Sequence, residues 1–356
     1  MELFGIEDFD SIVDRYEECF RFENHDRPVM HITAPTGVEA ETPPAPATIQ
    51  ERWLNFEWRI DCAEARLPCM HYEAEGFPTF RCNLGPDMFT AFLGSKLEMS
   101  EDSPNTTWVK PRVTDWAAEP PLRIDPDNYY WLEWTRFMQM AAERGRGRWI
   151  TTTGDYHTNG DALSGLRNPS DLCIDLIESP DEIKQRLDEC MAAWKQAVDR
   201  ACEITMPHNG GVTSCWLNAA VRGKYTALQN DFCCLVGPDM FREFFQDITR
   251  REAEHLDKAI YHWDGPGAIP HRDALCEIKE VDMIQWVPGS GQKPMSEWID
   301  LLKSVQERGK GLWIGCGAHE VEPIMRELKP EGVIIRCATG SPEEARELVR
   351  NTERIY

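Results

Sequence analysis

Apolar residues recur along this chain in short runs separated by segments with helical spacing, a pattern that predicts alternating strands and helices. The runs predict eight strands that begin at about residues 28, 77, 149, 210, 259, 283, 311 and 332. Helical spacing follows most of them, and residues 7–20 predict one more helix ahead of the first strand. Two later helices open with the capping sequences Ser179-Pro180-Asp181-Glu182 and Ser341-Pro342-Glu343-Glu344. Strands that alternate with helices indicate a parallel sheet.

Eight strand–helix units in one chain predict an α/β fold of the (β/α)8 type, the TIM barrel. The chain has no GxGxxG turn, which argues against a doubly wound nucleotide-binding sheet. We expect residues 1–356 to form a single barrel domain, with a helical extension at about residues 1–24. Segments 35–48 and 96–126 are rich in proline or irregular in pattern, so we expect long, lid-like loops over the C-terminal face of the strands.

The composition argues against several classes of partner. Acidic side chains outnumber basic ones 61 to 38, and a net charge of −23 repels nucleic-acid backbones and anionic membranes. The sequence has no apolar run long enough to span a membrane and no basic and apolar leader, so we expect a cytoplasmic protein. Its 13 cysteines form no CxxC pair, which argues against a zinc ribbon or a disulfide framework and suits a reducing, anaerobic host.

Polar and sulfur-bearing residues follow the predicted strands at the edge where the chemistry of a (β/α)8 barrel takes place. His262 and Asp264 stand two positions apart on one strand, so their side chains point the same way. They offer two metal ligands, or a hydrogen-bonded pair that steadies the turn before Gly265. Asp155 and His157 end the third strand and are candidates for acid–base catalysis, or for capping the next helix.

Other residues near this edge are suited to contacting a substrate. Arg272 and Arg336 are candidates for anchoring a substrate carboxylate. Arg336 alternates with Cys337 along its strand and can face a helix instead. The residues expected to line the pocket through their shape and hydrogen bonds are Asn83, Trp216, Gln285 and Trp286.

Four local patterns, taken in their order and spacing, resemble the uroporphyrinogen decarboxylase superfamily over about residues 25–350. The fold that the resemblance implies is a (β/α)8 barrel, in agreement with the strand count. The patterns are Gly154-Asp155 with Asp161-Ala162-Leu163, Asp231 with Gly237-Pro238-Asp239-Met240-Phe241, His262-x-x-Gly265, and Cys337 followed by Ser341-Pro342-Glu343-Glu344.

The resemblance implies one of two chemistries. One branch decarboxylates porphyrinogen acetates without a cofactor. The other transfers a methyl group to or from a corrinoid, with zinc held by a His-x-Cys pattern after one strand and by a cysteine after the last strand. Here His262 matches the histidine and Cys337 the last cysteine, while Asp264 stands where the pattern has cysteine. Aspartate is itself a zinc ligand, and Cys316 on the neighbouring strand is a candidate for the missing sulfur.

We therefore expect a zinc-dependent methyltransferase that moves a methyl group, in either direction, between a small-molecule ether or thiol and a corrinoid. The resemblance implies a corrinoid-carrying partner protein over the barrel mouth and a possible pairing of two chains as a homodimer. A cofactor-free decarboxylase is the alternative, although the arginine-rich segment of that branch has no counterpart around residues 25–37. A non-catalytic small-molecule binder on the same barrel is the third hypothesis.

Overall fold

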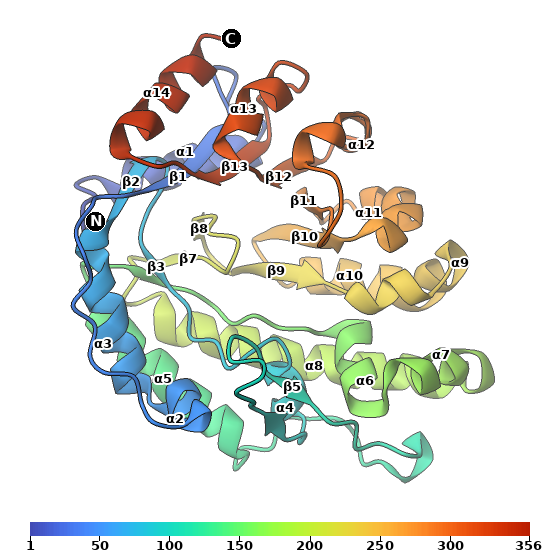
Figure 1. Cartoon of the computed structure of the whole chain (residues 1–356). Helices are drawn as coiled ribbons and strands as arrows, with labels where there is room; N and C mark the ends of the chain where they lie inside the picture. Colours follow the sequence, from blue (N-terminus) through green and yellow to red (C-terminus); the bar gives the residue numbers. More distant parts are fainter.

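A computed structural model describes residues 1–356 and has a seven-stranded, mostly parallel sheet at its centre (Figure 1). The order of the strands in the sheet is β2-β1-β13-β12-β11-β10-β9. Each neighbouring pair is parallel except β1 and β2, which run antiparallel. The strands are β1 (Val29–Pro35), β2 (Met70–Ala74), β9 (Tyr225–Gln229), β10 (Lys258–Asp264), β11 (Met283–Val287), β12 (Gly311–Gly315) and β13 (Val333–Ala338).

A second, short parallel ladder joins β3 (Thr79–Phe80) to β6 (Ile150–Thr151). Side chains link the end of β6 to β9, since Thr153 Oγ1 donates to the carbonyl of Tyr225 at 3.2 Å. No backbone ladder joins β6 to β9 or β2 to β3, so the ring of strands is open at two places. The fold is thus mixed α/β and resembles a TIM barrel, as the sequence predicts, but its hydrogen-bonded ladder is not closed.

The predicted fourth strand is in the wrong place. The strand near residue 210 is β7 (Val212–Thr213), which pairs antiparallel with β8 (Val221–Arg222) and not with the parallel sheet. The strand that pairs with β10 is β9, which the sequence pattern did not reveal. The other seven predicted starts lie within two residues of a strand of the parallel ladders.

Helices flank the strands on the outside, as Figure 1 shows for α10 to α14 along one side and α3, α5 and α8 along the other. A further antiparallel pair, β4 (Leu97–Glu98) with β5 (Trp108–Val109), lies in the segment 96–126. None of the helices has the length and apolar content that a membrane span requires. The helices are α1 (Phe9–Phe20), α2 (Ile49–Leu54), α3 (Phe56–Arg66), α4 (Met88–Phe92), α5 (Tyr129–Gly145), α6 (Asn159–Arg167), α7 (Pro169–Glu178), α8 (Pro180–Thr205), α9 (Pro238–Met240), α10 (Gln246–Ala253), α11 (Arg272–Glu277), α12 (Ile299–Gln306), α13 (Ala318–Met325) and α14 (Pro342–Glu353).

The core is divided in two by the alternation of side chains along the strands. Alternate residues of β10 to β13 pack in an inner cluster that also contains the apolar face of α1, namely Ile260, Met283, Trp313 and Ile334. Their neighbours pack in an outer cluster against the helices, namely Tyr261, Ile284, Ile314 and Ile335. The same alternation, continued toward the strand ends, turns His262, Gln285 and Arg336 inward.

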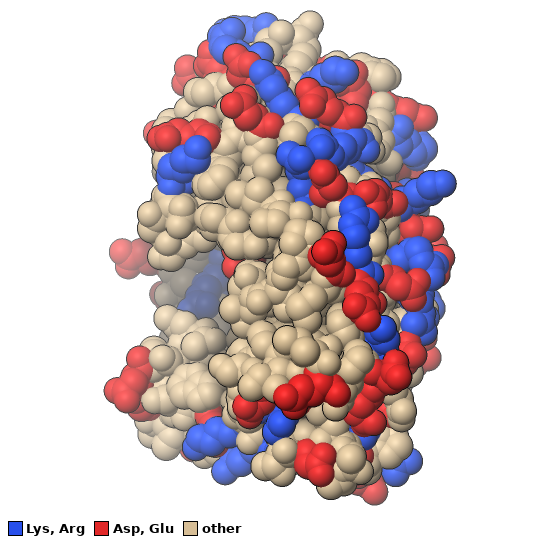
Figure 2. Space-filling view, turned by 90° about the vertical axis from the view of Figure 1, so that its right-hand side faces the viewer, with Lys and Arg blue, Asp and Glu red and all other residues tan.

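The two predicted loops are both tied to the body of the protein. In the segment 35–48, the carbonyls of Pro43 and Pro46 accept hydrogen bonds from Trp58 and Arg52 at 3.3 and 3.2 Å. In the segment 96–126, Arg186 of α8 donates to the carbonyls of Trp116, Glu119 and Pro120. Figure 2 shows that charged side chains crowd one half of the face it presents and that a hollow opens at its left-hand edge, with a basic side chain visible in its depth.

Candidate active site

One group of possible metal ligands lies at the C-terminal ends of β9 and β10. One ligand atom from each of Asp231, His262 and Asp264 lies within 4.8 Å of the others, and His262 Nε2 is 3.8 Å from Asp231 Oδ1. His262 Nδ1 is 2.7 Å from Gln285 Oε1 on the neighbouring strand. Because that oxygen accepts a hydrogen bond, the ring carries its hydrogen on Nδ1 and leaves the lone pair of Nε2 facing Asp231. This is the tautomer that binds a metal through Nε2.

The register of the sheet explains why these side chains meet. His262 stands beside Gln285 of β11 and Gln229 of β9, so the three side chains lie in one layer across three strands. Gln229 Nε2 donates to Asp155 Oδ1 at 3.3 Å, which brings in the segment after β6. The ring of Trp216 packs edge-on against His262, with centroids 5.1 Å apart. A continuous polar layer therefore covers the inner cluster.

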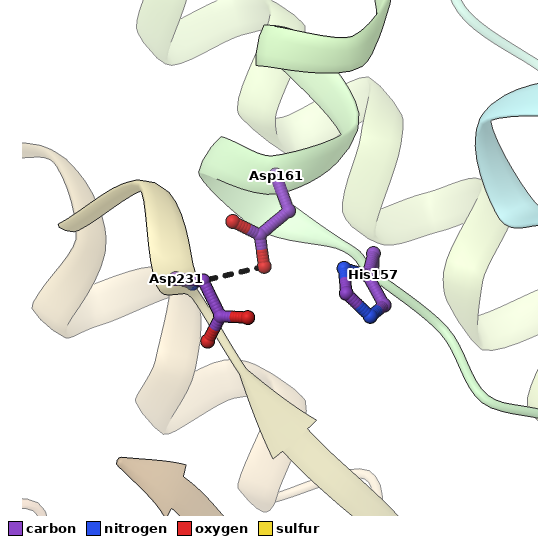
Figure 3. Close-up of side chains that lie close together, drawn as sticks. All are labelled: His157, Asp161 and Asp231. Atoms are coloured by element: carbon purple, nitrogen blue, oxygen red, sulfur yellow. Dashed lines mark hydrogen bonds between the residues drawn. The ribbon is translucent and has the colours of Figure 1, made fainter. Parts of the chain in front are cut away.

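A second group, drawn in Figure 3, consists of His157, Asp161 and Asp231. Asp161 lies in the first turn of α6, and its two carboxylate oxygens accept the backbone N–H groups of Asp231 at 3.0 Å and Phe232 at 2.7 Å. These bonds hold the 3₁₀ turn Asp231–Leu235 against α6. Asp161 therefore fixes where the Asp231 side chain starts, and Figure 3 shows the carboxylate of Asp161 with Asp231 on one side and His157 on the other.

The pKa values of Asp161 and His157 in this second group are both raised. Burial raises the pKa of Asp161 to about 7, and the charge of Asp231 acts in the same direction. Burial opposes the protonation of His157, but the carboxylates of Asp161 and Asp155 outweigh it, so the pKa of His157 is raised. A carboxyl group with a pKa of about 7 can gain or lose a proton near pH 7, which is what general acid–base catalysis needs.

Asp231 is common to both groups and is incompletely bonded. Its Oδ1 atom is buried and has no hydrogen-bond partner. Burial raises the pKa of Asp264, and Asp231 raises it further while His262 lowers it, because the two carboxylates repel each other. A buried carboxylate oxygen without a donor is costly, and a cation between these side chains would satisfy it. The residues present therefore fit a divalent metal with nitrogen and oxygen ligands.

Most of the predicted site residues lie near this layer. His262 and Asp264 converge as the alternation along a strand implies, Gln285 orients His262, and Trp216 packs on its ring. His157 and Asp155 lie at the same edge. Asn83 instead shapes a turn, because its Oδ1 accepts the backbone N–H of Gly85 at 2.7 Å.

Four predicted residues are not part of the site. Trp286 alternates with Gln285 and so faces the helices, where its ring packs between Trp263 and Trp298 at 4.8 and 5.1 Å. Arg272 begins α11 and contacts Asp273 and Ser304 of the outer layer. The other two residues are Cys316 and Cys337.

The two predicted cysteine ligands do not meet His262 in the structure. Cys337 shares its side of β13 with Ile335 and belongs to the outer cluster, and Cys316 packs partly against the same cluster. Neither thiol joins a group of possible ligands. Burial raises the pKa of Cys337 to about 11, and burial together with Cys337 raises that of Cys316. On β13, Arg336 points inward and Cys337 points toward the helices. This is the reverse of the orientation expected for a cysteine ligand.

The sequence pattern does not identify two residues of the site as functional. Asp161 and Asp231 appear in the patterns that carry the family resemblance, but neither was recognised as a functional residue. Asp231 comes two residues after β9, so a fourth strand placed at 225–229 would have put it on the rim with the other candidates. Asp161 is found only through its contact with the chain 70 residues further on.

Comparison with known proteins shows a relative at the level of fold. No family model and no curated protein matches the chain. Among solved structures, a methyltransferase from Methanosarcina mazei superposes with a TM-score of 0.63 and 14% sequence identity, covering 96% of this chain and 98% of that one. At this identity the match shows that the two chains share a fold.

Proposed function

We propose that the protein is a metal-dependent methyltransferase and that Asp231, His262 and Asp264 hold a zinc ion. The observation that carries the proposal is the convergence of these three side chains around a buried carboxylate oxygen that has no partner. The fold shared with a methyltransferase supports it. The proposal includes the barrel of the uroporphyrinogen decarboxylase superfamily, with β3 and β6 occupying the place between β1 and β9.

The residues of the site have distinct roles in this proposal. Bound zinc would supply Lewis acidity to an ether oxygen or a thiol. Gln285 keeps the lone pair of His262 Nε2 directed at the ligand group, and three protein ligands leave a position open for the substrate. His157 holds or releases the proton that an alcohol product gains or a thiol substrate loses, with Asp161 tuning its pKa. Trp216 forms a wall that excludes water beside His262.

The methyl group also needs a donor or acceptor at the open side of this layer. We propose a reduced or methylated corrinoid on a partner protein, docked near the segments 35–48 and 96–126. Both segments border the barrel and are anchored by hydrogen bonds, so they offer the partner a formed surface.

Metal analysis tests the proposal directly. Wild-type protein is reconstituted with zinc under reducing conditions and desalted. We expect it to hold about one zinc per chain, because the three ligands form a single site. His262→Ala and Asp231→Asn are expected to lose it. His25→Ala is the matched control, because His25 is an exposed histidine that also faces a carboxylate, Glu331 at 3.0 Å. Stoichiometric zinc in His262→Ala, or none in the wild type, refutes the zinc site.

Cofactor-free decarboxylation is a second candidate, and one observation favours it. The buried carboxyl of Asp161, with its pKa raised to about 7, can hold a proton at neutral pH and deliver it to a carbon. This reaction would continue unchanged in a chelator, whereas the methyl transfer proposed above would stop.

A further inference from the structure

A cavity of about 380 Å³ lies where the ring of strands is open between β2 and β3, beside α3. We call it the arginine cavity, because four arginines line it together with apolar and aromatic side chains and no acidic residue. The arginines are Arg52, Arg59, Arg66 and Arg81, and the indoles of Trp58 and Trp149 form parts of the wall. Its volume is within the range of small-molecule sites.

Three of these arginines lack a carboxylate partner. Arg59 donates to the carbonyls of Trp53 at 3.0 Å and Asn83 at 2.8 Å, and Arg81 donates to the carbonyl of Trp216 at 2.7 Å. Arg66 makes no hydrogen bond or ion pair with the protein, and only Arg52 has a counter-charge, Glu101 at 3.2 Å. The chain carries 61 acidic against 38 basic residues, so carboxylates are plentiful elsewhere and missing from this cavity.

The guanidinium charge of Arg59 is held at a cost. Burial lowers the pKa of Arg59 to about 10, whereas Arg66 and Arg81 are exposed to solvent. A charge that is removed from water without a counter-ion destabilises the folded state. An anion in the cavity would relieve that cost and gain charge-assisted hydrogen bonds, which are the strong ones.

We propose that the arginine cavity binds a small organic anion, with its acidic group on the guanidinium groups and its apolar or aromatic body on the cavity wall. A free inorganic anion would leave most of the volume and the two indoles unused. The wide acidic surface disfavours a polyanion such as nucleic acid, because the whole chain would repel it.

The cavity adjoins the active site through Arg81. That residue donates to the carbonyl of Trp216, whose ring packs against His262. Trp216 therefore contacts both Arg81 of the cavity and His262 of the active site. That the anion is the substrate of the methyl transfer rests on the proposed function, whereas binding of the anion does not.

Calorimetry with four probes tests the binding: phenyl phosphate and benzoate as aromatic anions, inorganic phosphate as an anion without a body, and benzamide as the neutral counterpart of benzoate. We expect saturable binding of an aromatic anion and none of benzamide. Arg66→Gln and Arg81→Gln should each weaken that binding by about ten- to hundredfold, the effect of one charge-assisted hydrogen bond. Arg350→Gln should have no effect, because Arg350 is an exposed arginine of α14 that also lacks a carboxylate partner.

The other outcomes contradict the proposal. Equal affinity for benzamide and benzoate would show that charge is not recognised, and absence of binding by either aromatic anion would remove the site. Inorganic phosphate binding as tightly as phenyl phosphate would indicate an adventitious ion only. Zinc content is measured on the same arginine variants: retained zinc with lost anion binding supports the cavity independently of the catalytic metal, and retained anion binding in both variants refutes it.

Discussion

Glu252 on α10 gives a pH-dependent prediction that can be calculated from its surroundings. Its side chain is only 1% exposed. One oxygen accepts a hydrogen bond from Thr158 Oγ1 at 3.1 Å, and the other, Oε2, has no partner. Burial raises the pKa of Glu252 from 4.5 to about 8, although Thr158 opposes the rise. The carboxyl of Glu252 is therefore protonated in the folded protein at neutral pH. It contacts Thr158, the residue that precedes α6.

The sign of the effect on stability follows from proton binding. Between pH 4.5 and about 8 the folded protein keeps a proton on Glu252 that the unfolded chain has lost. The stabilising contribution is complete below pH 4.5 and is lost as the pH rises to about 8, by about 1.4 kcal/mol per pH unit. Over the whole interval the loss amounts to about 5 kcal/mol. Glu252→Gln, which is neutral at every pH, removes this dependence.

Urea denaturation of wild type and Glu252→Gln at several pH values from about 5 to about 8 measures the difference. We expect the free energy of unfolding of the variant to rise relative to wild type by about 1.4 kcal/mol per pH unit. Glu254→Gln is the matched control, because Glu254 is an exposed carboxylate two residues further on, and its curve should run parallel to wild type. Parallel curves for Glu252→Gln would refute a raised pKa at this position.

Two further substitutions examine the assignments made above. Cys337→Ala should keep the zinc content of the wild type, because its thiol faces the outer cluster and not His262; zinc loss on metal analysis would show that the strand is turned the other way. Arg186→Met should destabilise the protein by about 3–5 kcal/mol in urea denaturation, because it removes a buried charge from two carboxylates and three backbone carbonyls. It should also speed proteolysis within residues 116–121, and an unchanged cleavage rate would contradict this anchoring role.

The strands that the sequence revealed are those buried on both faces. Met283–Val287 and Val333–Ala338 are mainly apolar, with one polar residue each, because helices cover one side and the inner cluster the other. The missed strand, β9, has Thr226 and Gln229 among its five residues. Its hydroxyl and amide serve contacts with the segment after β6, so its composition reflects tertiary contacts that a local pattern does not contain.

The site was predictable as far as alternation along a strand goes. His262 and Asp264 share a face by the period of two, and that part of the prediction places them correctly. The same rule places Gln285 and Trp286 on opposite faces of the strand. The expectation that both residues line one pocket is therefore inconsistent with the rule. The hydrogen bonds between Asp161 and the turn at Asp231 depend on packing between α6 and the end of β9. No residue spacing in the sequence predicts this packing.

The division of the core also fixes how a ligand can reach the polar layer. The inner cluster, with α1 packed into it, fills the interior toward the N-terminal ends of the strands. His31 lies at the border of this cluster, and burial together with Arg336 lowers its pKa to about 3, so it stays neutral and supplies no charge there. A ligand therefore reaches the polar layer from the C-terminal ends of the strands, the edge at which His262, Asp264 and Asp231 meet.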